Sequence, residues 1–445
     1  MTPPEKPPFV RHANRRAFLK TSIAATAGAA ALGGLSPARG AHAAGSDVIR
    51  VGLIGCGGRG PGAALDAMCA DPGVRLVALA DVFADKVESR RRMLKKEKPD
   101  RVQVDDAHCF SGLDGYQHVI ESSDVVLIAC AAKYHPVYLL AAVQAGKHVF
   151  VEKPHAIDPV GVRQAAAACE LARQKKLSVL SGLNSRYDWA FQEAIKRIHD
   201  GAIGDIVSVE QNYLRTPYGL CYRQPGQNEV RYQFANLYHF AWLCGDNVAQ
   251  FLIHNLDLTG WAMHEQTPIK AHGLGGRSSC FGEVYGDIFD HHSVVYEYAN
   301  GVRMYAFARM QNGCYDEFSS TIFGTKGKFV AFPPRYYGIT GEKPWKNTRH
   351  LVDSHKVEQV ALLQAIRSGQ PLNSGFHMAN STMVAVMGQL SCYCGKELTW
   401  DQVSKSDFVF TPKVEDVTLD MDISIKPGPG GIYPTPMPGL TEFKI

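Results

Sequence analysis

The sequence predicts an α/β protein with two folded domains, and three observations predict it. Apolar, β-rich segments alternate with helix-compatible segments between residues 48 and 154, which is the pattern of a parallel sheet. A glycine-rich turn joins the first of these strands to its helix. Beyond residue 205, strands succeed one another without intervening helices, which indicates a largely antiparallel sheet. A chain of 445 residues with 45% hydrophobic and 20% charged residues is long enough for two such domains.

The charges divide the chain at residue 43. The net charge is +4, but residues 1–43 contain six basic side chains against one acidic, and the remainder contains 41 basic against 42 acidic. Because the body of the chain has no basic excess, we expect no nucleic-acid partner.

The basic N-terminus has the order of an export signal. Arg15 and Arg16 precede an uncharged, Ala-rich run over residues 21–35, and residues 41–43 form a small-residue cleavage pattern. This order resembles the twin-arginine (Tat) signal of bacteria, which directs folded proteins to the Tat export machinery. The apolar run is about 15 residues, below the roughly 20 that span a bilayer. We therefore expect residues 1–43 to be a Tat signal and the protein to be periplasmic, without a stable membrane anchor; an uncleaved anchor and a flexible basic tail are the alternatives.

The eleven cysteines all lie beyond this signal and include no Cys-x-x-Cys pair. Cys392 and Cys394 are the closest two, and their spacing is too tight for a usual zinc site. A chain with a full hydrophobic core does not need a disulfide framework. We expect most of the cysteines to be buried as small apolar side chains.

The clearest chemistry follows the first strand, residues 48–54. The strand opens into GCGGRG at residues 55–60 and then into a helix-compatible segment. Glycines there permit a tight turn, a close approach of the backbone to a pyrophosphate and packing of the helix on the strand, while the helix N-terminus receives the negative charge. A second strand, residues 74–80, ends at an aspartate suited to ribose hydroxyls. This context predicts a Rossmann dinucleotide-binding domain over residues 44–184, with cofactor contacts from Gly55, Gly57, Gly58, Arg59, Gly60 and Asp81.

Asp81 also bears on the choice of dinucleotide. A carboxylate that faces the ribose 2′ position repels an extra phosphate, so we expect NAD, with NADP less favoured. Arg59 is the nearby cation that could offset this preference, although it lies in the glycine turn rather than after the second strand.

Two further strands complete the predicted N-terminal sheet. Residues 124–130 lead to His135, and after an Ala-rich helix ended by Gly146, residues 147–151 lead to Glu152 and Lys153.

The segment from 185 to 412 reads as the second α/β domain. A helix is expected over residues 191–198 and a strand over 206–214. Residues 294–298 and 302–308 flank Asn300-Gly301, a strong hairpin signal. Helices are also expected over 357–367 and 380–390. Residues 413–445 are rich in Pro and Gly towards the end, and we expect an extended arm that packs on its own domain or on a neighbouring subunit.

Taken together, these motifs resemble the Gfo/Idh/MocA oxidoreductases. The resemblance rests on the glycine turn, His135-Pro136, residues 145–149 and Glu152-Lys153-Pro154, and it continues through short matches at 184–187, 254–257, 324–327 and 393–400. It implies that the antiparallel sheet of the second domain is open, covers a nicotinamide pocket and often forms the interface of a homo-oligomer. It also implies hydride transfer between bound NAD(P) and a hydroxyl or carbonyl group of a sugar or polyol.

The resemblance assigns roles to individual residues. Lys153 and His254 map onto the catalytic pair, which must remove the hydroxyl proton as hydride leaves. A lysine can do so only with a depressed pKa, which burial beside a cationic nicotinamide favours; the plainer alternatives are an exposed strand end and a core histidine. Further cofactor contacts are expected from His135 and Glu152, and substrate contacts from Asn184, Arg186, Tyr187, Gln250 and Asp257.

The chain departs from the family at Gln250, where many members have Asp. An amide forms hydrogen bonds but cannot take a proton, so the proton transfer falls to Lys153 and His254. Asp257 either orients His254, three residues before it, or forms a salt bridge elsewhere.

The remaining histidines and tyrosines support weaker predictions about metal and sugar binding. His291 and His292 are adjacent on a predicted strand and would point to opposite faces, so we expect no metal site there. Five tyrosines lie in the long segment before His254 and either stack on sugar rings or pack a loop-rich lid: Tyr213, Tyr218, Tyr222, Tyr232 and Tyr238.

Three functions remain open from the sequence. The favoured one is an exported sugar or polyol oxidoreductase, which would have to load its NAD before export and restore its redox state in place. The second is a redox-neutral, NAD-dependent glycoside hydrolase or lyase that acts through a transient keto-sugar. The third is a non-catalytic, cofactor-stabilised sugar-binding protein, which the departure at Gln250 permits.

Overall fold

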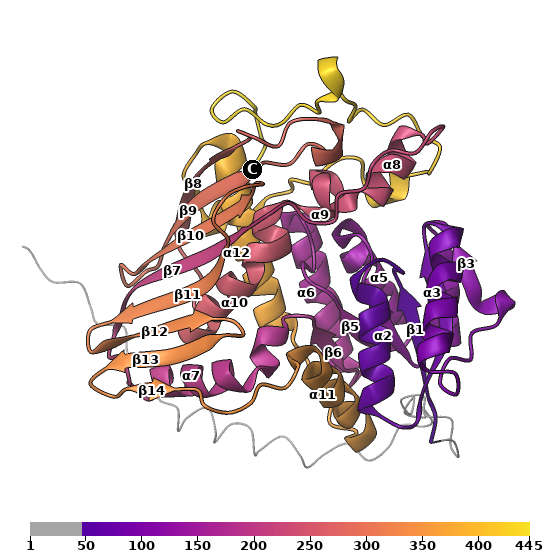
Figure 1. The fold of residues 1–445 in the computed structure, drawn as a ribbon, viewed down its shortest axis with the longest axis horizontal. Helices are drawn as coiled ribbons and strands as arrows, with labels where there is room; N and C mark the ends of the chain where they lie inside the picture. Colours follow the sequence, from indigo (N-terminus) through magenta and orange to yellow (C-terminus); the bar gives the residue numbers. More distant parts are fainter. Residues whose placement is uncertain (1–46) are drawn as a thin grey trace, which may run out of the picture. The chain divides into compact units, whose positions relative to one another are not determined.

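Two β-sheets organise the chain (Figure 1). The computed structural model describes residues 47–445, so the predicted Tat signal lies outside the described residues. A six-stranded sheet occupies the N-terminal part, and a nine-stranded sheet lies beside it. The predicted fold class is confirmed: a parallel Rossmann domain is followed by an α/β domain with a mostly antiparallel sheet.

The first sheet is parallel throughout and has the order β3-β2-β1-β4-β5-β6. The order reverses between β1 and β4, and this switch point opens a crevice at the carboxyl ends of the strands. The central strands are apolar throughout because helices cover both faces. The strands are β1 (Ile49–Ile54), β2 (Val74–Asp81), β3 (Cys109–Ser111), β4 (Val125–Ile128), β5 (His148–Val151) and β6 (Val179–Ser181).

Short local signals set the helices of this domain. The Asp158 side chain accepts a hydrogen bond from the Gly161 amide and begins the last helix, with Pro159 in its first turn. Gly146, with a φ of 75°, follows the end of the preceding helix as predicted. The helices are α2 (Arg59–Ala70), α3 (Ala84–Glu97), α4 (Gly115–Ser122), α5 (His135–Gln144) and α6 (Pro159–Gln174).

The second sheet has the order β14-β13-β12-β11-β7-β10-β9-β8-β15. The predicted hairpin is confirmed, since β9 and β10 pair in antiparallel register around Gly301. One pair, β7 with β10, is parallel, because a long helical crossover carries the chain from β7 to the far side of the sheet. The strands are β7 (Ile206–Arg215), β8 (Lys270–Gly276), β9 (His291–Glu297), β10 (Arg303–Met310), β11 (Glu317–Gly324), β12 (Gly327–Phe332), β13 (Tyr336–Gly341), β14 (Trp345–Lys346) and β15 (Leu398–Thr399).

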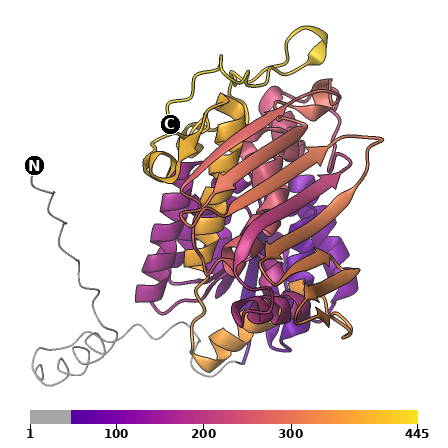
Figure 2. The same cartoon turned by 90° about the vertical axis from the view of Figure 1, so that its left-hand side faces the viewer.

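One face of the second sheet is covered and the other is open. The helices α7 (Trp189–His199), α10 (Ile253–Ala262) and α12 (Gly375–Cys394) pack on the inner face and share its apolar core. Figure 2 turns the opposite face to the viewer, and no helix lies across its strands. Exposed apolar side chains on the strands include Val207, Leu274, Tyr305 and Phe332.

The helix α11 (Ser354–Ser368) was expected to belong to the second domain, but it joins the core of the first. Leu362, Leu363 and Ile366 are buried against side chains of β1 and α2. The helix returns because its apolar face needs a partner, and the outer side of α2 supplies one. The boundary at residue 184 is therefore crossed by a later segment.

The C-terminal arm packs on its own chain, one of the two expected outcomes. It runs over α8 (Glu229–Ala235) and α9 (Ala241–Cys244) (Figure 1). Its Tyr433 is buried edge-on against Phe240, and the Ile425 carbonyl accepts a hydrogen bond from Gln233. A short helix, α13 (Trp400–Lys405), precedes the arm.

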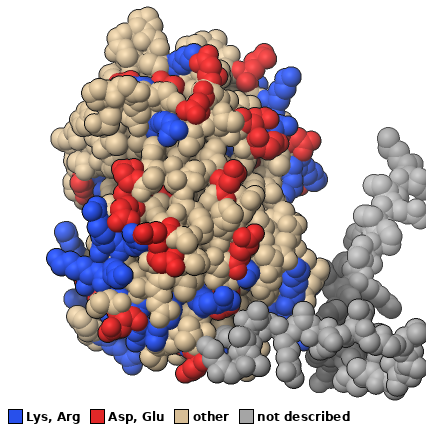
Figure 3. All heavy atoms as spheres, turned by 90° about the vertical axis from the view of Figure 1, so that its right-hand side faces the viewer, with Lys and Arg blue, Asp and Glu red and all other residues tan. Residues whose placement is uncertain are grey.

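The surface charges, the burial of the cysteines and the apolarity of the helices can be compared with the sequence predictions. On the face formed by the N-terminal domain, basic and acidic side chains are interspersed (Figure 3). Six of the eleven cysteines are buried and all are free thiols, as predicted for most of them. Within residues 47–445, no helix has both the length and the apolarity to cross a membrane.

The placement of α11 can be tested by truncating its buried leucine. Leu362→Ala removes a fully buried side chain, and we expect it to lower the free energy of unfolding by about 2–5 kcal/mol. Leu440→Ala, at a position that is 75% exposed, should change it by less than about 0.5 kcal/mol. Denaturant titration measures both, and equal effects would contradict the packing described.

Candidate active site

The glycine turn between β1 and α2 shows three distinct constraints. Gly55 has a φ of 102°, and a Cβ there would lie 2.4 Å from the carbonyl oxygen of Ala129. A Cβ on Gly60 would lie 1.9 Å from the Gly55 oxygen, so the helix packs on the turn only with glycine. A Cβ on Gly57 would meet no atom within 4 Å. The backbone at Gly57 thus faces open space at a helix N-terminus, where a pyrophosphate can approach.

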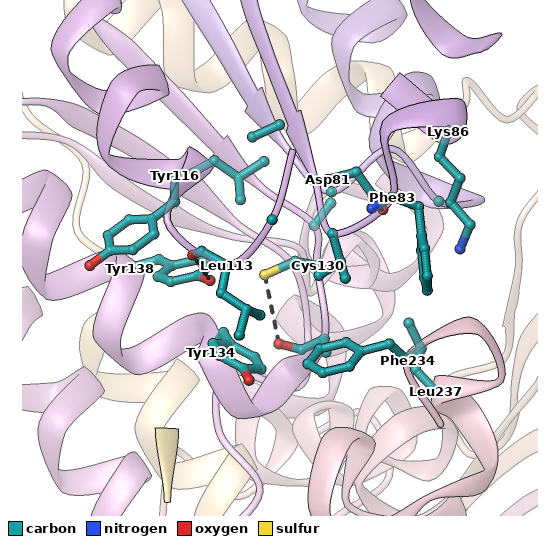
Figure 4. A pocket seen from close by; sticks show the side chains of 18 residues that line it. Asp81, Phe83, Lys86, Leu113, Tyr116, Cys130, Tyr134, Tyr138, Phe234 and Leu237 are labelled. Atoms are coloured by element: carbon teal, nitrogen blue, oxygen red, sulfur yellow. Dashed lines mark hydrogen bonds between the residues drawn. The ribbon is translucent and has the colours of Figure 1, made fainter. Parts of the chain in front are cut away.

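Asp81 ends β2 beside this turn. Its carboxylate accepts hydrogen bonds from the backbone amides of Cys56 (2.8 Å) and Phe83 (3.0 Å). The carboxylate thereby lines a pocket beside the glycine turn (Figure 4). Each carboxylate oxygen keeps a lone pair for a further donor, which suits the hydroxyl groups of a ribose.

Aromatic and apolar side chains form the other walls of this pocket. Tyr134 and Tyr138 come from the segment after β4, and Phe234 and Leu237 come from α8 and the turn that follows it (Figure 4). An apolar slot opposite a carboxylate fits an adenosine, whose base is flat and whose ribose is polar. Lys86 also lines the pocket, above the ring of Phe83. No local motif points to Lys86, Phe234 or Leu237.

Arg59 does not point at the cofactor pocket as expected. Its guanidinium forms ion pairs with Glu152 (2.7 Å), Glu358 (3.2 Å) and Asp66 (3.3 Å). Three carboxylates therefore hold it on the outer side of the turn. The expected contact of this side chain with the dinucleotide, and its suggested preference for NADP, are corrected: Arg59 fixes the turn instead.

The Glu152 and His135 side chains also contact backbone groups around the crevice. Glu152 is buried and accepts a hydrogen bond from the Lys153 amide as well as from Arg59. His135 is buried with its ring nitrogens 2.8 Å from the Pro154 carbonyl oxygen and 3.1 Å from that of Cys130. These carbonyls follow β5 and β4, so His135 ties the two strand ends together rather than presenting a nitrogen to a ligand.

Lys153 lies where the two sheets meet. Its ammonium donates to the backbone carbonyl of Gln250 and lies 5.4 Å from the centre of the Phe251 ring. Burial lowers the pKa of Lys153 to about 8; the charge of Glu152 opposes this shift, and the smaller effects of Arg59 and Arg215 act in the same direction as burial. With a pKa of about 8, about a tenth of this amine is neutral at pH 7, and the neutral form can accept a proton.

A turn of π-helix over residues 248–252 makes this contact available. The carbonyl that Lys153 contacts thus belongs to a π-turn, and π-bulges are frequent at functional sites. The Gln250 side chain is buried and donates to the Cys244 carbonyl (2.7 Å). Gln250 therefore contributes its backbone oxygen to the site, while its amide holds the π-turn.

His254 follows on the same helical segment and lies close enough to Lys153 for their charges to interact. The pKa of His254 is well below its ordinary value, because of burial and then because of the charges of Lys153 and His355. A neutral imidazole beside a partly neutral amine can share a hydroxyl proton between them. The structure thus places the two predicted catalytic residues within electrostatic range of each other.

Arg186 and Asp257, expected at the substrate, form a buried structural ion pair. Arg186 binds Asp257 through two nitrogens (2.8 and 2.9 Å) and also binds Glu265 (2.8 Å). Ser381 donates to the same aspartate. This bidentate pairing saturates both groups, so Asp257 does not orient His254 and Arg186 has no free face for a sugar. Together they fix the segment after β6 to α10.

Asn184 and Tyr187 lie at the contact between this segment and α11. The Asn184 amide donates to the Ser354 hydroxyl (2.8 Å). Burial and the nearby charge of Glu358 raise the pKa of Tyr187 to about 12. Both side chains thus lie beside the start of α11, a helix that sequence reasoning did not connect with the site.

An aromatic wall surrounds Phe251. Tyr213 stacks on it with ring centres 5.5 Å apart, and Tyr218 and Tyr238 meet it at 6.0 and 6.3 Å. A Cβ on Gly58 would lie 3.8 Å from the Tyr218 hydroxyl, so this ring reaches back over the glycine turn. Three of the five expected tyrosines therefore face the cleft next to Lys153. Tyr232 is fully buried instead, where Arg223 stacks on it.

The adjacent histidines on β9 point to opposite faces, as expected for a strand. His291 pairs with Asp290 on the partly exposed side, and His292 is buried 3.1 Å from Asp246. No group of three or more metal-ligating side chains converges among residues 47–445.

Comparison with known proteins identifies the family. Residues 49–183 match the Gfo/Idh/MocA model, described as an oxidoreductase family with an NAD-binding Rossmann fold. This region belongs to the Gfo/Idh/MocA oxidoreductases. The predicted resemblance is confirmed, and the glycine turn, Asp81 and Lys153 all lie within the matched region.

Two curated relatives carry glycoside hydrolase names. Glycosyl hydrolase family 109 protein 3 of Phocaeicola vulgatus is 25% identical over 332 residues, which are 66% of this chain and 55% of the relative. A family 109 protein of Saccharopolyspora erythraea is 27% identical over 260 residues, 55% of this chain and 53% of that one. The chain thus spans about half the length of these curated relatives.

Solved structures share the fold over most of the chain. Aldose-aldose oxidoreductase of Caulobacter crescentus, complexed with glycerol, has a TM-score of 0.62 at 17% identity and covers 79% of this chain and 99% of its own. Levoglucosan dehydrogenase in complex with NADH and levoglucosan has a TM-score of 0.61 at 17% identity and covers 80% and 100%. At this identity the likeness establishes the two-domain fold.

The assignment of Asp257 can be tested by Asp257→Asn. The variant keeps the side-chain volume but leaves a buried guanidinium with one carboxylate, so we expect the free energy of unfolding to fall by about 3–5 kcal/mol. Denaturant titration measures it. Asp401→Asn, which removes an exposed partner of Lys405, serves as the control and should have almost no effect. An Asp257→Asn variant with unchanged stability and lost activity would favour the catalytic role instead.

Proposed function

We propose that the protein oxidises a hydroxyl group of a sugar or polyol with a tightly bound nicotinamide dinucleotide. One observation carries the proposal: Lys153, buried with a pKa of about 8, follows β5 in the same domain as the glycine turn, and its charge acts on the buried His254. A base that is poised near neutral pH suits removal of a hydroxyl proton. Carbohydrate-acting neighbours in the same fold support a sugar or polyol as the substrate class.

The residues present fit the dinucleotide that the family implies. Gly57 leaves room for the pyrophosphate, Asp81 faces the ribose site, and the aromatic slot accepts the adenine. Bound NAD supplies the hydride acceptor. Lys153 takes the hydroxyl proton as the carbonyl forms, His254 hydrogen-bonds the same oxygen, and the aromatic wall around Phe251 keeps water from the reacting carbon.

NAD is proposed in preference to NADP. The Asp81 carboxylate repels a 2′-phosphate, and Arg59 is engaged by three carboxylates on the other side of the turn. Lys86 is the cation at the pocket mouth that opposes this preference. Titration of the purified protein with each dinucleotide measures the ratio of the two affinities.

A second candidate is supported by the relatives named glycosyl hydrolase family 109. In this reaction the oxidation is transient: the ketone makes a neighbouring C–H acidic, the glycosidic bond is eliminated, and the hydride returns to the sugar. Lys153 and His254 would serve the first step unchanged. The two functions differ in whether reduced cofactor accumulates.

Export by the Tat route is part of the proposal and rests on the sequence of residues 1–43. A periplasmic protein meets little free NAD, so a folded-state route would allow the cofactor to be loaded first. We expect the Arg15→Lys, Arg16→Lys double variant to remain in the cytoplasm, because the paired arginines are the signal. Cell fractionation measures it, and periplasmic recovery of the variant would rule out the Tat route.

We also propose a homo-oligomer that uses the open face of the second sheet. The exposed Val207, Leu274, Tyr305 and Phe332 give that face an apolar character. Sedimentation of the purified protein tests the proposal, and a monomer at all concentrations would contradict it.

The central experiment separates the two reactions. The purified protein is denatured to detect bound nicotinamide by absorbance, and the native protein is offered a panel of free sugars, polyols and aryl glycosides. Accumulation of reduced cofactor with a free sugar supports the oxidoreductase. Release of the aryl group without net reduction supports the hydrolase. If neither reduced cofactor nor a released aryl group is detected, the remaining function is a binding protein.

Lys153→Met tests the catalytic base. Methionine fills the same space without a titrating group, and we expect the rate of cofactor reduction to fall by about 10²–10⁴-fold. In the unmodified protein the rate should rise with pH through about 8, as the amine loses its proton, and this rise should be absent from the residual activity of the variant. Steady-state kinetics between pH 6 and pH 10, about 2 units on either side of the pKa, measure the rate of each protein and its pH dependence. A profile that falls across this range would exclude Lys153 as the base.

A further inference from the structure

A buried charge cluster lies behind the glycine turn. The roles proposed so far in catalysis and cofactor binding do not explain why its carboxylates and histidine lie together. We call it the Arg59 cluster: Arg59 and Asp66 of α2, Glu152 after β5, and His355 and Glu358 of α11. The Arg59 guanidinium touches Glu152, Glu358 and Asp66 and lies 3.1 Å from the His355 ring nitrogen Nδ1. The same nitrogen lies 3.3 Å from Glu358 Oε1.

The cluster holds more carboxylates than cations. One guanidinium faces three carboxylates, so the cluster would carry a net charge of −2 if each were ionised and His355 were neutral. Glu358 is the most buried, with a side-chain exposure of 0%. Its Oε1 faces Arg59 and His355, whereas its Oε2 is buried without a hydrogen-bond partner among the described residues. An oxygen in that position favours a proton over a charge.

The electrostatics agree with this geometry. Burial raises the pKa of Glu358 to about 7, and the nearby Glu152 acts in the same direction, against His355 and Arg59. Tyr187, on the segment after β6, is the other titratable group that faces Glu358. The Glu358 carboxyl therefore gains and loses its proton in the same pH range as the Lys153 amine.

His355 connects the cluster to the catalytic groups. It lies in the first turn of α11, its side chain is 37% exposed, and its charge contributes to the lowered pKa of His254. One ring nitrogen thus faces Glu358, while the rest of the ring is partly exposed to solvent. On the other side of the cluster, Glu152 accepts from the backbone amide of Lys153.

We propose that His355 and Glu358 form the proton reservoir of the active site, which accepts the proton released in sugar oxidation and exchanges it with solvent. This inference rests on the proposed oxidation at Lys153. In that oxidation a bound nicotinamide would supply the acceptor for the hydride of the C–H bond, and Lys153 would take the proton of the O–H bond, so that a carbonyl forms. The proton then passes through the cleft to His355 and on to the Glu358 carboxylate, and Lys153 is again neutral. In the reverse direction, the same pair returns a proton to the carbonyl oxygen.

Glu358→Gln tests the reservoir with little change of shape. Glutamine can still face Arg59 and His355 but cannot titrate. We expect the pH profile of kcat to lose an ionisation near 7, and kcat at neutral pH to fall by about 10–100-fold, at or below the lower end of direct acid–base effects. KM should change little. His355→Asn should give a similar loss, and the double variant should lose no more than either single variant, because the two groups act in series.

Asp66→Asn is the matched control. It removes a carboxylate from the same guanidinium, yet Asp66 does not contact His355 or Glu358, so the ionisation near 7 should remain in its kcat profile. An unchanged profile in Glu358→Gln, or loss of the ionisation in Asp66→Asn, would overturn the proposal. If the unmodified protein reduces no cofactor with any substrate, it is the proposed oxidation that fails.

Thermal unfolding tests Glu358 without any turnover. The folded pKa of the Glu358 carboxyl, about 7, lies above its unfolded value, so the folded protein binds more protons at this site. The contribution of Glu358 to stability therefore falls as pH rises from the unfolded pKa to about 7. Glu358→Gln should therefore match the unmodified protein in Tm near pH 5 and exceed it near pH 8, on either side of about 7. A lower Tm for the variant at the higher pH would show an ordinary stabilising ion pair with Arg59 and overturn the proposal.

Discussion

The ion pair between Arg59 and Glu152 is the interaction on which the geometry of the cleft depends. Arg59 lies in the glycine turn and is the first residue of α2, and Glu152 stands immediately before Lys153. Their contact joins the glycine turn to the strand end that carries the Lys153 amine. Because Arg59 also binds Glu358, the same guanidinium fixes α11 against the N-terminal domain.

Burial decides the chemistry of the groups so arranged. Lys153 loses its hydration where the two sheets meet and has only a backbone carbonyl and an aromatic ring in exchange, which lowers its pKa. Glu358 loses its hydration beside other carboxylates, which raises its pKa. A base and an acid thus titrate within about one pH unit of each other because their environments shift them in opposite directions. Neither shift follows from residue type, and both follow from where the second sheet and α11 lie.

The parts of the site that could be predicted are those with local signals. The glycines at 55, 57 and 60 follow from the geometry of one turn, and Asp81 follows from the length of one β-α-β unit. Lys153 was found because its neighbours at 152 and 154 form a recognisable motif. Arg186 was misassigned, and the salt-bridge alternative for Asp257 could not be chosen, because their pairing is a contact across 71 residues. Arg59 was misassigned because two of its partners lie 93 and 299 residues away.

The sequence by itself determined the order of strands and helices, the dinucleotide turn, the family and the lysine at the end of β5. Each of these depends on hydrophobic period, on backbone freedom at glycine or on residues adjacent in the chain. Only the tertiary structure decided that α11 joins the first domain, that Arg186 binds Asp257 and that His355 and Glu358 stand behind the turn. Those outcomes depend on which buried charge finds which partner, and burial is a property of the assembled core rather than of any segment.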